Sequence, residues 1–154
     1  MRGADDTLCG LVEPNVSVTS ERIKALSVLH EAGVSTVVWL SPILPFINDT
    51  GENISMIMDM CRSAGVMGVL CFGMGVTLRE GNREYYYAFL DRAFPGLRNR
   101  YERLYGNRYE LPSPREAALM ELYHSKCSRY GIMHDNDVIF SYLREFPDPQ
   151  PSLF

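Results

Sequence analysis

Apolar positions in the first half of the chain follow an order that occurs twice. Each time, apolar residues at helical spacing run through a glycine into a short, almost continuous apolar segment. The two copies end their helical parts in Ala32-Gly33-Val34 and Ala64-Gly65-Val66, so the repeat has a period of 32 residues. The pattern predicts helices over 19–32 and 50–63, and strands over 35–40 and 67–72. Repeated helix–strand units predict an α/β fold with a parallel sheet that is part of a larger barrel.

Polar residues at the starts of the two helices predict how those helices are capped. Asp49, with Glu52 three residues later, predicts a capping box for the second helix. Ser17 or Thr19, followed by Glu21, offers the first helix an N-cap and an acidic first turn.

After Leu78 the repeat ends, and a region rich in tyrosine and arginine follows in which no further strand is predicted. Four helices are predicted there: from Asn82 to the residue before Pro95-Gly96, from Leu97 to Tyr105, from Ser113-Pro114 to Gly131, and over 136–145. Residues 1–16 are predicted to be irregular. The chain therefore divides into an α/β segment, 1–78, a helical extension, 79–146, and a proline-rich extended tail, 147–154.

Both predicted strands lead into segments that suit a ligand better than a tight turn. These are Ser41-Pro42-Ile43-Leu44-Pro45 and Gly73-Met74-Gly75. The carboxyl ends of parallel strands are where binding sites lie in such sheets. The simpler alternative is that Ser41-Pro42 only leaves its strand and that the two glycines only make a turn.

Composition and charge narrow the classes of function. The chain has 154 residues, of which 46% are apolar and 22% charged, as expected for one globular domain with a real core. A net charge of −4 gives no overall attraction to phosphate backbones, so we do not expect the chain alone to bind nucleic acid, although Arg98, Arg100 and Arg103 could contact a phosphate locally. The longest apolar run is far short of the roughly 20 residues that span a bilayer, so no membrane span is expected.

Cysteines and histidines predict no metal site. The four cysteines, at positions 9, 61, 71 and 127, match no zinc ribbon and no CxxC redox pair. The three histidines are scattered, without carboxylates at ligand spacing. Unpatterned thiols and the lack of a signal peptide predict a reducing cytoplasm.

Two long segments carry a resemblance to a known family. They are the stretches from Val38 to Asp49 and from Cys71 to Arg83, with further similarity at Glu13-Pro14, Phe94-Pro95-Gly96-Leu97, Tyr105-Gly106-Asn107-Arg108-Tyr109 and Gly131-Ile132. Together they resemble the carboxyl-terminal half of radical SAM proteins of the spore-photoproduct-lyase-like group.

The resemblance implies a partial (β/α) barrel, of which this chain holds two helix–strand units, with a helical carboxyl-terminal extension. In that family a CxxxCxxC loop binds a [4Fe–4S] cluster, which cleaves S-adenosylmethionine to a 5′-deoxyadenosyl radical. This sequence does not contain that loop. The resemblance assigns adenosyl contacts to Leu40, Ser41, Pro42 and Ile43 after the first strand, and adenine contacts to the backbone of Cys71, Phe72 and Gly73 after the second. The family's ribose contact would fall around Arg2-Gly3-Ala4.

These expectations describe a fragment or split subunit that supplies half of an S-adenosylmethionine site and none of the cluster ligands. Such a chain would not be catalytic alone. Its partner would be a cluster-bearing amino-terminal half on another polypeptide, or a second copy associating through open sheet edges. The alternative is a stand-alone, non-catalytic module that binds an adenosyl or nucleotide-type ligand or an interaction partner.

Overall fold

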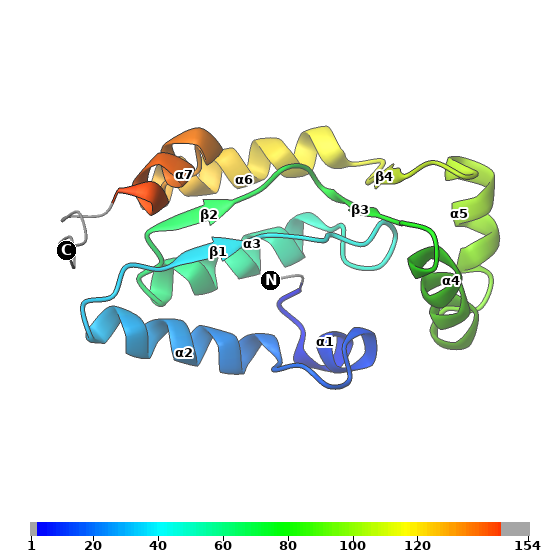
Figure 1. The fold of residues 1–154 in the computed structure, drawn as a ribbon, viewed down its shortest axis with the longest axis horizontal. Coiled ribbons are helices and arrows are strands. Elements are labelled where there is room, and N and C mark those ends of the chain that lie inside the picture. Colours follow the sequence, from blue (N-terminus) through cyan, green and yellow to red (C-terminus); the bar gives the residue numbers. More distant parts are fainter. Residues whose placement is uncertain (1–2, 146–154) are drawn as a thin grey trace, which may run out of the picture.

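The computed structural model describes residues 3–145, and Figure 1 shows the arrangement of their elements. In chain order they are α1 (Asp6–Val12), α2 (Thr19–Glu31), β1 (Val37–Trp39), α3 (Gly51–Ser63), β2 (Gly68–Leu70), β3 (Gly75–Thr77), α4 (Asn82–Ala93), α5 (Leu97–Tyr105), β4 (Glu110–Pro112), α6 (Glu116–Tyr130) and α7 (Asn136–Arg144). The predicted tail, 147–154, lies outside the described residues.

The two repeat strands pair in parallel at the centre of the molecule. Val37 lies opposite Gly68 and Trp39 opposite Leu70, which confirms the parallel pairing expected of a helix–strand repeat. One face of the pair carries Val38 and Val69, which join the largest buried cluster. Helices α3 and α6 pack against each other and supply most of the helical side chains of that cluster, so the sheet face is covered by one helix from each half of the chain.

The outer edge of β2 is closed by the segment between α6 and α7. The backbone N–H of Val69 donates to Met133 O at 2.8 Å, and Met133 N–H donates to Met67 O at 2.9 Å. At Cys71, two residues after Val69, the Asn136 side chain provides the hydrogen bonds. Its Oδ1 accepts from Cys71 N–H at 3.3 Å, and its Nδ2 donates to Cys71 O at 2.9 Å. Segment 132–136 thus satisfies the backbone groups that an edge strand would leave unpaired.

The amino-terminal region differs from the sequence prediction. Residues 1–16 were expected to be irregular, but α1 forms there because the Asp5 side chain accepts from the N–H groups of Thr7 and Leu8. The helix is too short for its apolar spacing to stand out. In α2 the N-cap position is Val18, whose N–H donates to Glu21, while Thr19 is buried and donates its hydroxyl to Gly3 O.

The cap of α3 also differs from the prediction. Thr50, not Asp49, is its N-cap and accepts from Asn53 N–H at 3.1 Å. Asp49 instead accepts hydrogen bonds from Phe46 N–H and Ser113 Oγ.

The prediction of no strand beyond Leu78 is wrong. β4 pairs antiparallel with β3, with Gly75 opposite Pro112 and Thr77 opposite Glu110. A three-residue strand that ends in proline gives no usable alternation in the sequence. Its pairing depends on a partner more than 30 residues away, which local patterns do not report.

The four helices predicted after Leu78 are all present, but α6 begins at Glu116, two residues later than the Ser113-Pro114 signal suggested. α4 and α5 form a lobe around a second buried cluster that includes Tyr87, Leu90 and Tyr101. The sequence placed α6 in the extension, yet α6 packs on α3 in the first cluster.

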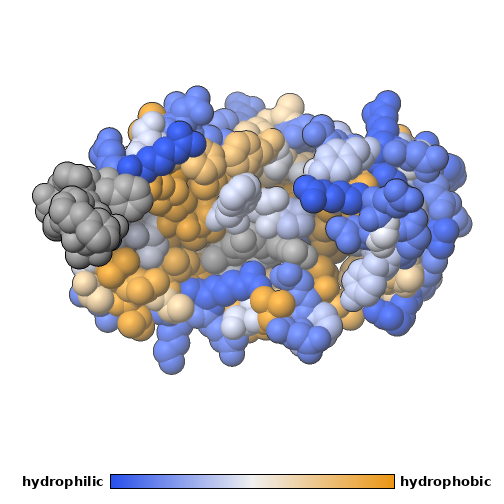
Figure 2. All heavy atoms as spheres, viewed as in Figure 1, coloured by the Kyte–Doolittle hydropathy of each residue, from blue (hydrophilic) through white to orange (hydrophobic). Residues whose placement is uncertain are grey.

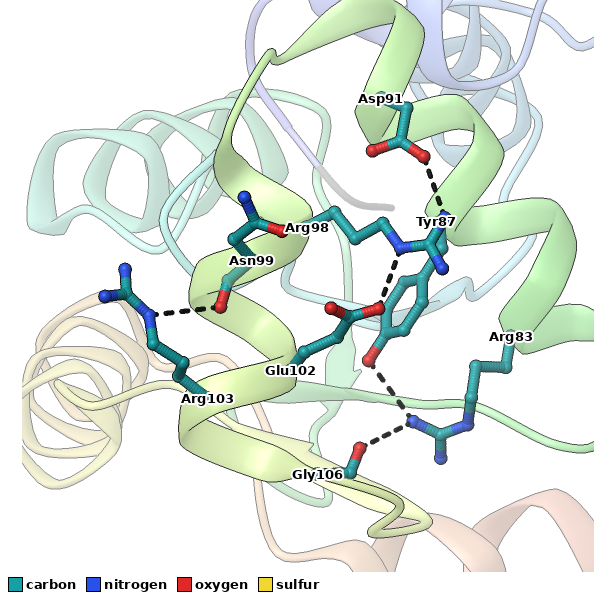
Figure 3. A network of polar contacts seen from close by, with 8 residues as sticks. All are labelled: Arg83, Tyr87, Asp91, Arg98, Asn99, Glu102, Arg103 and Gly106. Atoms are coloured by element: carbon teal, nitrogen blue, oxygen red, sulfur yellow. Dashed lines mark hydrogen bonds and ion pairs between the residues drawn. The ribbon is translucent and has the colours of Figure 1, made fainter.

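Arginine side chains tie the α4–α5 lobe together (Figure 3). Arg98 pairs with Asp91 at 2.9 Å and with Glu102 at 2.8 Å. Arg83 donates to Tyr87 OH and to Gly106 O, each at 3.3 Å. These arginines are therefore engaged within the protein and are not poised for an anionic ligand.

We predict that Asn136→Ala lowers the free energy of unfolding by about 2 kcal/mol, because it leaves the N–H and C=O of the buried Cys71 without partners. Urea denaturation at equilibrium measures the change. The matched control is Asn107→Ala, since Asn107 is exposed and its side chain forms no hydrogen bond with residues 3–145. Equal stability of the two variants would contradict the edge-closing role of Asn136.

Candidate ligand groove at the strand tips

A groove of about 420 Å³ lies at the carboxyl ends of the two parallel strands. Ser41 and Pro42 line it from the exit of β1, and Phe72 and Gly73 line it from the exit of β2. The opposite wall comes from β3, β4 and the first turn of α6, through Gly75, Val76, Thr77, Glu110, Leu111, Pro112 and Glu116. The groove is thus formed by segments separated by up to 75 positions in the chain, from Ser41 to Glu116.

The structure brings four of the seven sequence-predicted contact residues to this groove: Ser41, Pro42, Phe72 and Gly73. The other three are buried in the core. Leu40 and Ile43 have no exposed surface, and Cys71 is 5% exposed. Both backbone polar groups of Cys71 are bound by Asn136, so its predicted polar contact with adenine would have to share them.

Buried polar side chains clamp the loop that follows β1. Asp49 is 3% exposed, and its carboxylate accepts from Phe46 N–H at 2.7 Å and from Ser113 Oγ at 2.6 Å. Asn48 accepts from Leu44 N–H at 2.6 Å. Tyr101 OH donates to Pro45 O at 2.6 Å. The loop is therefore fixed to the start of α6 and to α5, and the Ser41-Pro42 wall of the groove is preorganised.

Gly73 lies against a carboxylate that the sequence interpretation did not single out. Met74 N–H donates to Glu116 Oε1 at 3.1 Å. A Cβ on Gly73 would lie 2.8 Å from the same oxygen, and the φ of Gly73 is +138°. This backbone conformation favours glycine whatever the space beside it, because L side chains rarely adopt such a φ. Glu116 is the acidic residue in the first turn of α6, and no local feature of the sequence indicates its contact with the β2 exit.

Exposed aromatic side chains lie beside the groove. Phe72 is 62% exposed and Trp39 is 53% exposed, with their ring centroids 5.5 Å apart. The ring centroid of Phe140, in α7, lies 6.2 Å from that of Phe72. Figure 2 shows apolar colour gathered on the part of this face where α2, the strands and α7 lie, whereas the α4–α5 end is largely hydrophilic. A planar ligand at the strand tips would thus have aromatic surface next to it.

Three of the four cysteines, Cys61, Cys71 and Cys127, are buried. Burial raises the pKa of Cys61 and of Cys127 to about 12, and burial also raises the pKa of Cys71. These residues sit on α3, on α6 and after β2, and remain thiols at neutral pH. Within the described part of the chain, no group of three or more His, Cys, Asp or Glu side chains is arranged to hold a metal ion. No helix among residues 3–145 is both long and apolar enough to cross a bilayer.

Similar proteins are found in mycobacteria. Uncharacterized protein Mb2609c of Mycobacterium bovis, and uncharacterized proteins MT2655 and Rv2578c of Mycobacterium tuberculosis, are each 29% identical to this chain over 125 residues. The match covers 81% of this chain and 36% of each relative, so the chain spans about a third of the length of these curated relatives. Comparison with known families finds no match. No solved structure matches the chain either.

We predict that Gly73→Ala destabilises the fold by about 2 kcal/mol, because the φ of +138° at this position is one that L-residues rarely adopt. Thermal unfolding followed by circular dichroism measures the change. Gly10→Ala is the matched control. Gly10 lies within α1, and no atom lies within 4 Å of the place that a Cβ would occupy, so alanine there should be neutral or slightly stabilising. Equal stability of Gly73→Ala and the wild-type chain would contradict the requirement for a positive φ at the exit of β2.

Proposed function

We propose that this chain is the adenosyl-facing, carboxyl-terminal part of a radical SAM protein of the spore-photoproduct-lyase-like group. The tips of β1 and β2 would hold the adenosyl group of S-adenosylmethionine, and the ligands of the [4Fe–4S] cluster would come from outside this chain. The observation that carries the proposal is the convergence of Ser41, Pro42, Phe72 and Gly73 on one groove at the ends of parallel strands.

The chemistry of the groove suits a nucleoside. Its volume of about 420 Å³ falls within the usual range of about 300–1,000 Å³ for small-molecule pockets. Phe72 and Pro42 offer flat apolar surface for a base, the Ser41 hydroxyl can donate or accept a hydrogen bond, and Gly73 permits close approach of a ring.

The state of the cysteines supports the division of roles. The described residues of this chain do not fit a [4Fe–4S] cluster, because a cluster needs converging ligands and no group of three or more His, Cys, Asp or Glu side chains among residues 3–145 is arranged to hold a metal ion. All four cysteines are free, which supports placing the chain in a reducing cytoplasm.

The sheet edges indicate where a partner would join. Segment 132–136 closes the outer edge of β2. On the β1 side of the sheet, a mostly apolar groove of about 310 Å³ lies between α2 and β1. It is lined by Arg22, Ala25, Leu26, Leu29, Val38 and Trp39. Parallel strands joined through a helix follow a right-handed crossover, so the place for a strand preceding α2 is beside β1. We propose that a cluster-bearing segment adds its strand there, within a longer chain or from another polypeptide.

The alternative is a stand-alone, non-catalytic module that binds an adenosyl-type ligand. The specific observation in its favour is that β3, β4 and α6 of this same chain already supply the second wall of the groove. Affinity separates the two ideas, because a half site should bind weakly and a self-contained site should not.

We predict that the isolated chain binds S-adenosylmethionine with a Kd of about 1 mM, and that Phe72→Ala weakens this binding by about tenfold through the loss of base stacking. Titration calorimetry measures the Kd, and the fluorescence of Trp39, the single tryptophan, reports on the neighbouring Phe72. Tyr85→Ala is the control, since Tyr85 is 73% exposed and does not line the groove.

Micromolar affinity would favour the stand-alone module. The absence of binding at about 10 mM ligand would remove both ideas, because it lies well beyond the affinity expected even of a half site. A stoichiometric [4Fe–4S] cluster on this chain after anaerobic reconstitution would contradict the division of roles.

A further inference from the structure

The charged residues that line the groove at the strand tips are all acidic. Glu110 and Glu116 contribute carboxylates, and the lining includes no lysine, arginine or histidine among the described residues. The negative charge of the lining differs from the charge of the chain around it. The segment from Arg79 to Arg115 contains eight arginines and only five acidic residues. The acidic lining is therefore a local property of the groove.

Neighbouring cations are directed away from these carboxylates. Arg115 precedes Glu116, but its guanidinium reaches Asp49 O at 3.5 Å. Arg79 donates to Tyr109 OH at 3.3 Å, an interaction that also raises the pKa of Arg79. Within residues 3–145 no arginine or lysine forms an ion pair with Glu110 or Glu116.

Glu116 is held in place and still has capacity for a ligand. Its Oε1 accepts from Met74 N–H at 3.1 Å, and its side chain lies against Gly73. Its second oxygen makes no hydrogen bond to the described residues. A carboxylate fixed through one oxygen loses little conformational entropy when the other oxygen binds a ligand. Glu110, opposite Thr77 on the exposed edge of β4, adds negative charge at the rim.

We propose that this groove selects a nucleoside-type ligand that carries a positive centre, and that Glu116 is the residue that determines this selectivity. The inference rests on the proposed function, since it takes the adenosyl site as given and adds its preference for charge. A sulfonium or ammonium group near Glu116 gains electrostatic stabilisation, whereas a phosphate at the same place is repelled by both carboxylates.

The test is a comparison of paired ligands with variants that preserve shape. Calorimetry gives Kd values for S-adenosylmethionine against S-adenosylhomocysteine, which differ by the sulfonium charge, and for adenosine against AMP, which differ by the phosphate. We expect the wild-type chain to favour the first member of each pair by about fivefold, the size expected for one partly exposed charge interaction. Glu116→Gln keeps the side-chain length and the acceptor for Met74 N–H, and it should reduce both ratios towards one. Glu121→Gln, an exposed position on the same helix, is the matched control and should leave both ratios unchanged.

The possible results distinguish failure of the charge selectivity from failure of the adenosyl site itself. Binding of all four ligands with ratios that Glu116→Gln leaves unchanged would overturn the selectivity of Glu116 and leave the adenosyl site standing. Tighter binding of AMP than of adenosine by the wild-type chain would overturn it as well. If none of the four ligands binds, the adenosyl site fails and the charge selectivity fails with it. A loss of both preferences in Glu116→Gln alone would support the inference.

Discussion

The exit of β2 is organised by one side chain, that of Asn136, which binds both the N–H and the C=O of Cys71 as the next residue of a paired strand would. A two-stranded parallel sheet has little stability alone. Here the carboxamide, together with Met133, closes one edge of that sheet. Beyond Cys71 the chain is free to turn, so Phe72 is exposed and Gly73 passes beside Glu116. The groove exists because β2 ends at this point.

The wall formed by Ser41 and Pro42 depends on polar side chains that are buried at a distance from the groove. Asp49 is almost fully buried, and its bonds to Phe46 N–H and Ser113 Oγ join the loop after β1 to the start of α6. Such a buried carboxylate is tolerated only where donors surround it. The same contacts therefore join the starts of α3 and α6, which pack on each other, and fix residues 44–49, the segment that directly follows Ser41, Pro42 and Ile43. In this chain the rigidity of the site and the stability of the core have one source.

The sequence predicted the elements whose signal is local and failed where the signal is distant. The helix–strand repeat, the parallel pairing and the helices after Leu78 follow from apolar spacing, and four residues predicted at the strand tips do line the groove. β4 and the role of Glu116 were missed because each depends on a partner more than 30 residues away. Asp49 was interpreted as a helix cap, since an acidic residue before a helix is ambiguous until its donors are known. The ligand contacts of Leu40, Ile43 and Cys71 were assigned from the family resemblance, and the core encloses all three residues.

The function proposed for the chain depends on where a ligand binds. Mapping of backbone amide shifts by nuclear magnetic resonance, as S-adenosylmethionine is added to the isotope-labelled chain, tests this location most directly. The account predicts the largest shifts at Phe72, Gly73 and Gly75, with smaller shifts at Ser41 and Thr77, and none in the α4–α5 lobe. Shifts centred on α4 and α5, or spread evenly over the molecule, would contradict it.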